Sequence, residues 1–154
     1  MSGTQDRIER RIDIDADAAR VWGLISRPGW WINDGAIVNH PVESTDDVNV
    51  IHHEKYGDFR IRTVTLDPPR YAAFEWLNGA NDAESSPEAG STLVEFWLED
   101  RAGGVTLRVV ESGFASLGTS EEERRKNIDE NTEGWEQELA AAKTWIGQHA
   151  AGQP

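Results

Sequence analysis

Residues 111–149 read ESGFASLGTSEEERRKNIDENTEGWEQELAAAKTWIGQH, the end of a strand, a short linker and one long helix. Ser120 and Glu123 have the spacing of a capping box, so we expect the helix to begin near Glu121. The residues expected to face the protein interior recur every three or four positions and form one stripe, Ile128, Thr132, Trp135, Leu139, Ala142, Ile146 and His149. The Ala- and Gly-rich tail predicts fraying before His149.

The chain before this helix has the pattern of an antiparallel sheet. Arg7 to Asp15 alternates apolar with charged residues, which is typical of a half-exposed strand. After the helix cap Asp17 we expect a short amphipathic helix, and Trp30 to Ile32 predict a second short helix or turn. Further strands are expected at Val48–Tyr56, Phe59–Asp67, Tyr71–Leu77, Thr92–Glu99 and Val105–Phe114, whereas residues 38–47 have no clear pattern.

The composition limits the class of protein. With 154 residues the chain suits a single domain, 1–154, with a structured core at about 7–149. It has no cysteine, which excludes disulfides and thiolate chemistry. Its 28 acidic and 15 basic residues give a net charge of −13, which disfavours nucleic acid as a partner. It lacks a secretory signal or an apolar run long enough for membrane insertion, so we expect a cytoplasmic protein.

One arrangement lets the sheet and the last helix both bury their apolar sides. A twisted antiparallel sheet curls around the carboxy-terminal helix, because a sheet with one apolar face needs another element to cover it. The fold class is therefore α+β, with two short helices after the first strand. An arrangement of this kind often encloses a cavity.

Four stretches resemble the family of activators of heat-shock-protein-90 ATPase, within the START and birch-pollen-allergen-like (SRPBCC) superfamily. They are residues 12–16 with Val21-Trp22, residues 67–70 before Phe74-Glu75-Trp76, residues 111–114, and residues 131–135 with Leu139. The resemblance implies the helix-grip fold, a hydrophobic cavity between sheet and helix, and no obligatory metal or nucleotide cofactor. Members of the superfamily look like lipid or polyketide carriers, cyclases, stress-related proteins and chaperone cofactors.

Strand alternation predicts which side chains face the helix. Val94, Phe96 and Leu98 set the register, and the neighbouring strands then turn Ala72, Phe74, Trp76, Val105, Leu107 and Val109 to the same side. The same alternation turns Glu111 inward, where a carboxyl group needs a hydrogen-bonding partner, a cation or a proton. The alternative is that Glu111 sits at the strand end and bonds backbone or solvent.

The predicted ligand site combines aromatic walls with this carboxyl group. Its candidate residues are Trp22, Trp31, Phe74, Trp76, Phe96, Val109, Glu111, Thr132, Trp135 and Leu139. The alternative is that aromatic residues at these periodic positions form a solid core with no open cavity.

Other charged or titratable residues give weaker signals. Arg60 and Arg62 share a strand face and would bind a ligand carboxylate if that face were concave, and would otherwise face solvent. His52 and His53 are adjacent, point to opposite faces and cannot share a metal, while His40 and His149 add no metal-binding spacing.

The opposite face of the sheet predicts a protein contact. It carries Trp97 with Tyr71, Leu77 and Leu93 among acidic residues, which resembles the centre and rim of a homodimer interface. The alternative is scattered surface hydrophobicity.

Three functions follow from these observations. The first is noncatalytic binding of a hydrophobic or aromatic molecule, such as a lipid, polyketide or flavonoid, in the cavity. The second is a chaperone-associated stress protein acting through its surface. The third is a polyketide cyclase or dehydratase-like enzyme with Glu111 as its acid or base.

Overall fold

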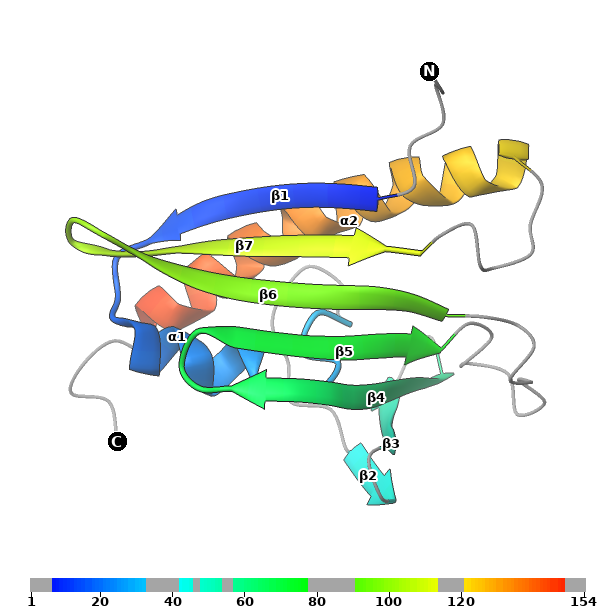
Figure 1. Ribbon diagram of the computed structural model, residues 1–154, viewed down its shortest axis with the longest axis horizontal. Coiled ribbons are helices and arrows are strands. Elements are labelled where there is room, and N and C mark those ends of the chain that lie inside the picture. The colour runs from blue at the N-terminus through cyan, green and yellow to red at the C-terminus, as the bar shows by residue number, and fades with distance from the viewer. Residues whose placement is uncertain are drawn as a thin grey trace.

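The computed structural model describes residues 7–32, 42–45, 48–53, 57–77, 91–113 and 121–148. These residues form one antiparallel sheet and two helices (Figure 1). The strands are β1 (Arg7–Ile14), β2 (Val42–Thr45), β3 (Val48–His53), β4 (Gly57–Asp67), β5 (Tyr71–Leu77), β6 (Ser91–Arg101) and β7 (Gly104–Ser112). The helices are α1 (Ala18–Ile25) and α2 (Glu121–Gln148). Within these residues no helix is long and apolar enough to cross a membrane.

The order of the described strands in the sheet is β1-β7-β6-β5-β4-β3-β2, so among them only the pairing of β1 with β7 departs from sequence order. Figure 1 shows α2 running behind the sheet along β1 and β7, with α1 beside its carboxy-terminal half. The helix covers the apolar side of the sheet, as the sequence predicts.

The predicted inward face of the sheet is confirmed. Val94 pairs with Glu111, Phe96 with Val109, and Leu98 with Leu107. All six of these side chains are buried. They pack with the α2 residues Ile128, Trp135, Leu139, Ala142 and Ile146, so the predicted stripe of the helix is its buried side. Ser120, His149 and the side chain of Glu123 lie outside the described residues, and the capping box stays a prediction.

One short helix, rather than two, follows the first strand within the described residues. Asp17 caps α1 by accepting a hydrogen bond of 2.9 Å from the Arg20 backbone. The predicted second helix or turn is a turn, in which Ile32 N–H donates to Gly29 O at 3.0 Å. Gly29 has φ 75°, and a Cβ there would lie 2.6 Å from Ile51 Cγ1, so this tight turn requires glycine. The turn places Trp30, Trp31 and Ile32 in the core.

Strand ends differ from the predictions by a few residues. β4 begins at Gly57 rather than Phe59, and β6 extends over Ser91–Arg101 rather than Thr92–Glu99. The predicted ends of β3 at Tyr56 and of β7 at Phe114 lie outside the described residues. The sequence did not predict β2, a short edge strand whose Val42 side chain is exposed. Such a strand has little apolar pattern because it contributes almost nothing to the core.

Candidate functional site

A cleft of about 240 Å³ opens between one side of the sheet and the middle of α2. Its sheet side is aromatic, and its helix side is mostly polar. The lining residues are Trp31, Ile32, Phe59, Trp76, Glu130, Asn131, Gly134, Trp135, Gln137 and Glu138. This volume lies just below the range of about 300–1,000 Å³ that is typical of pockets for drug-sized ligands.

The aromatic wall is centred on Trp31. Its ring centroid lies 5.6 Å from Phe74, 5.8 Å from Trp76 and 5.7 Å from Trp135, in tilted or edge-to-face arrangements. Trp31 and Trp135 are 4% and 3% exposed, whereas Trp76 and Phe59 are half-buried. The cleft therefore has a rigid aromatic floor and two aromatic side chains with accessible surface at its rim.

Glu111 lies beneath this floor and joins three elements. Its Oε2 accepts a hydrogen bond of 2.7 Å from the Thr92 hydroxyl, and its Oε1 accepts from Asn131 Nδ2 at 3.2 Å and Trp135 Nε1 at 2.8 Å. The side chain is only 1% exposed. Burial raises the pKa of Glu111 above its usual 4.5, and the bonds from Thr92, Trp135 and Asn131 oppose that rise.

Residues 15–144 match the family model described as "Activator of Hsp90 ATPase homolog 1-like protein". The chain belongs to this family. No curated protein matches the chain.

Solved structures of other proteins share this fold. A structure of protein MLL2253 from Mesorhizobium loti is 16% identical, with a TM-score of 0.67, and the match covers 94% of this chain and 98% of that one. The Aha1 dimer from Colwellia psychrerythraea is 16% identical, with a TM-score of 0.64 and coverage of 92% and 96%. CalU16 from Micromonospora echinospora is 18% identical, with a TM-score of 0.60 and coverage of 91% and 75%. These likenesses confirm the helix-grip fold of this family member.

The ten ligand-site residues predicted from the sequence separate into three groups. Trp31, Trp76 and Trp135 line the cleft, and Glu111 holds two of its lining residues from beneath. The other six do not line the cleft. Four of them are buried in the core, namely Phe74, Phe96, Val109 and Leu139. Trp22 packs against the core from α1, and the Thr132 hydroxyl donates a hydrogen bond of 2.6 Å to Ile128 O. Part of the predicted set therefore borders an open cleft, and part of it is solid core.

Residues on both sides of the cleft were not among the candidates predicted from the sequence. Phe59 and Ile32 complete the apolar wall, and the polar wall comes from α2. The α2 residues Asn131, Gly134, Trp135 and Glu138 follow the three- and four-residue spacing of one helix face, which was the available signal. Thr92 continues the inward alternation of Val94 and Phe96, which predicts its contact with Glu111.

The remaining candidates lie away from the cleft. Arg62 Nη1 contacts Glu75 Oε1 at 2.7 Å on the outer face, so it does not present its guanidinium group to the concave side. His52 and His53 do point to opposite faces. His52 contacts Asp58 at 2.7 Å and Glu43 at 3.1 Å, while His53 is buried against Phe59. The described residues contain no group of three side chains that could hold a metal ion. His40 and His149 lie outside them.

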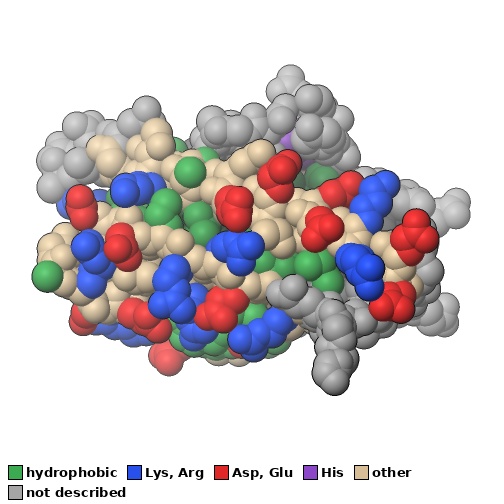
Figure 2. Space-filling view, turned by 90° about the horizontal axis from the view of Figure 1, so that it is seen from above, with side chains coloured by type: hydrophobic (Ala, Val, Ile, Leu, Met, Phe, Trp, Pro, Cys, Tyr) green, Lys and Arg blue, Asp and Glu red, His purple; other side chains and the backbone are tan. Residues whose placement is uncertain are grey.

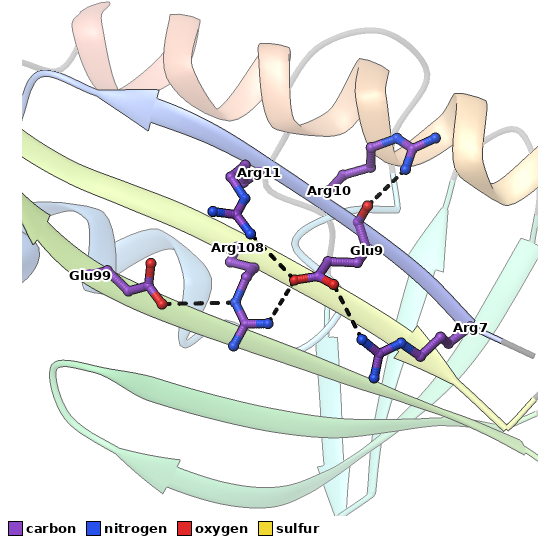
Figure 3. A network of polar contacts seen from close by, with 6 residues as sticks. All are labelled: Arg7, Glu9, Arg10, Arg11, Glu99 and Arg108. Atoms are coloured by element: carbon purple, nitrogen blue, oxygen red, sulfur yellow. Dashed lines mark hydrogen bonds and ion pairs between the residues drawn. The ribbon is translucent and has the colours of Figure 1, made fainter.

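Trp97 on the outer face is covered rather than isolated. The Arg108 guanidinium lies 4.2 Å from the centroid of its ring, and Tyr71 packs at 5.3 Å. Arg108 in turn contacts Glu9 at 2.8 Å and Glu99 at 3.9 Å (Figure 3). Acidic and basic side chains alternate over the side of the molecule shown in Figure 2. This outer network keeps the tryptophan half-buried within the chain itself.

Proposed function

We propose that the protein is a noncatalytic binding protein for a hydrophobic or aromatic small molecule, held in the cleft between the sheet and α2. The supporting observation is the aromatic rim of this 240 Å³ cleft, where Trp76 and Phe59 keep accessible surface above the packed ring of Trp31. Removing apolar ligand surface from water contributes about 25 cal/mol per Å² buried, before the cost of ordering the ligand.

A binding role fits Glu111 better than a catalytic one. Its two oxygens accept three hydrogen bonds from the protein, and it lies behind Trp135 rather than on the surface of the cleft. A general acid or base must reach the reacting atoms of the substrate. Glu111 instead fixes the orientation of Asn131 and Trp135, the residues that do line the cleft.

Self-association through the outer sheet face is a second candidate. The stack of Tyr71, Trp97 and Arg108 forms an aromatic centre with a charged surround, and the Colwellia psychrerythraea Aha1 was solved as a dimer. Sedimentation of the wild type and Trp97→Ala tests it. A dimer that Trp97→Ala dissociates supports the interface, and a monomer at millimolar concentration contradicts it.

The binding proposal is tested with a screen of fatty acids, flavonoids, sterols and aromatic polyketides. Binding is followed by tryptophan fluorescence and by backbone chemical shifts. We expect saturable shifts at Trp76, Gly134 and Trp135, and weaker binding by Trp76→Ala. Trp22→Ala is the matched control, because Trp22 is also a half-buried tryptophan but does not line the cleft. Equal losses from both substitutions, or no saturable shifts, would contradict the proposal.

A further inference from the structure

We propose that the ligand is a planar aromatic amine that lies directly against the backbone of α2 at Gly134. This inference rests on the proposed binding function and adds the chemical class of the ligand and a residue that determines its specificity. It depends on two independent observations, the empty space above Gly134 and the hydrogen-bond acceptors beside it.

Gly134 has no structural reason to be glycine. It lies in the interior of α2, and it is not among the described glycines with positive φ, which are Gly29, Gly103 and Gly113. Among the described residues, a Cβ built on it would meet no atom within 4 Å. Glycine inside a helix is less favourable than alanine, so this position costs stability without helping the backbone or the packing.

The place of Gly134 in the cleft accounts for a glycine at this destabilising position in the helix. It lines the cleft next to Trp135 and faces the side that carries Trp76 and Phe59. Without a side chain there, a flat ring can approach the helix backbone and still contact the aromatic rim. Even a methyl group would occupy this space.

The polar wall favours a ligand that donates hydrogen bonds. The Asn131 amide nitrogen uses one of its two N–H groups to donate to Glu111 Oε1, and the amide oxygen adds an acceptor to this wall. Glu130 adds an exposed carboxyl group to the same wall, and no lysine or arginine is among the lining residues within the described ranges. An amino group suits these acceptors, its positive charge suits aromatic faces, and the net charge of −13 disfavours an anionic ligand.

Three indole probes of similar size separate the effect of the ligand's charge from that of its aromatic ring. Tryptamine carries an ammonium group, tryptophol a neutral hydroxyl group, and indole-3-acetate a carboxylate. We expect tryptamine to bind about tenfold more tightly than indole-3-acetate and tryptophol to have an intermediate affinity. Chemical-shift titration measures the three dissociation constants. Raising the salt concentration should weaken tryptamine binding and leave tryptophol unchanged.

Gly134→Ala tests the space above the helix. We expect it to weaken tryptamine binding about tenfold without unfolding the protein, because alanine favours a helix. Gly147→Ala is the control, since Gly147 lies on the same helix, is exposed, has equally open surroundings and does not line the cleft.

The outcomes distinguish this inference from the general binding function. If indole-3-acetate binds as tightly as tryptamine, or if Gly134→Ala binds like Gly147→Ala, the inference is overturned and the binding function stands. If neither the indoles nor any molecule of the wider screen binds, both are overturned.

Discussion

The indole nitrogen of Trp135 donates a hydrogen bond of 2.8 Å to Glu111 Oε1, which ties helix α2 to the last strand beneath the cleft. Thr92 and Asn131 bond the same carboxyl group. This contact therefore connects the packing of the core with the shape of the cleft.

Removing the Glu111 carboxyl group should destabilise the protein strongly. Glu111→Ala leaves the buried Trp135 donor without an acceptor and opens a cavity, so we expect a loss of about 2–4 kcal/mol in unfolding free energy. Glu111→Gln should be close to neutral, because its amide oxygen can accept from Asn131 and Trp135 and its nitrogen can donate to Thr92. Urea unfolding measures both variants. Equal losses would show that these hydrogen bonds do not carry the effect.

The stability difference between wild type and Glu111→Gln should depend on pH. Burial raises the pKa of Glu111 above 4.5 in the folded protein, so folding takes up a proton at this group. Its favourable contribution is complete below pH 4.5 and is lost as the pH rises through the folded pKa. Relative to the variant, the wild type should thus become less stable from pH 4.5 toward neutrality. Parallel stability curves would contradict the raised pKa.

His52 should titrate above its usual pKa. The hydrogen bond to Asp58, followed by the one to Glu43, raises the pKa of His52 above 6.5. Protonated His52 therefore stabilises the β2–β4 edge below pH 6.5, and this contribution disappears as the pH rises through the folded pKa. Nuclear magnetic resonance titration of the imidazole measures the shift. Asp58→Asn should reduce it more than Glu43→Gln, and the reverse order would contradict the assignment.

Arg108→Gln should raise the pKa of Glu9. The side-chain hydrogen bond from Arg108 is the main reason that the Glu9 pKa lies below 4.5, with smaller contributions from Arg7 and Arg11 (Figure 3). Ionised Glu9 stabilises the fold above pH 4.5, and the effect is lost as the pH falls through its lowered pKa. Carboxyl-carbon titration measures the change. Arg101→Gln is the control, because Arg101 lies on the same sheet but contacts Asp13 and Asp15 instead. This substitution should leave the pKa of Glu9 unchanged.

Two glycine substitutions should have opposite effects on stability. Gly134→Ala should raise the unfolding free energy by about 0.5–1 kcal/mol, because it replaces glycine within a helix and meets no neighbour. Gly29→Ala should lower it by about 1–3 kcal/mol, because φ is 75° and Ile51 lies 2.6 Å from the new Cβ. Thermal unfolding of both variants checks the two signs. If Gly134→Ala were less stable than the wild type, the new methyl group would have to meet neighbouring atoms, which would contradict the open space above Gly134.

The sequence was sufficient to predict the faces of the strands but not the contacts between elements. The period of two in a strand is strict, so Val94, Phe96 and Leu98 also determined the inward direction of Glu111. The helix stripe likewise predicted that Trp135 is buried. Whether its indole nitrogen reaches Glu111 depends on the height and angle of α2 over the sheet. Neither the strand period nor the helix period predicts these two quantities.

The extent of the cleft was also beyond prediction. Phe74 and Trp76 share one inward face, yet Phe74 is fully buried and Trp76 borders the cleft. Trp31 packs against both rings, and Phe74 also packs against Phe96 of β6, with 6.2 Å between the ring centroids. A pattern of apolar residues identifies the face of a strand, but it does not identify where the covering elements end.

The pairing of β1 with β7 has a consequence for how the protein is made. Residues 7–14 are synthesised early, yet their strand partner in the sheet lies at residues 105–112. On the ribosome, β1 must wait until nearly the whole sheet has emerged. The β3–β6 strands, which pair with their neighbours in sequence, can assemble sooner. β1 therefore leaves the ribosome before the other described strands and is among the last of them to join the sheet, so it is the strand that a chaperone would meet exposed for longest.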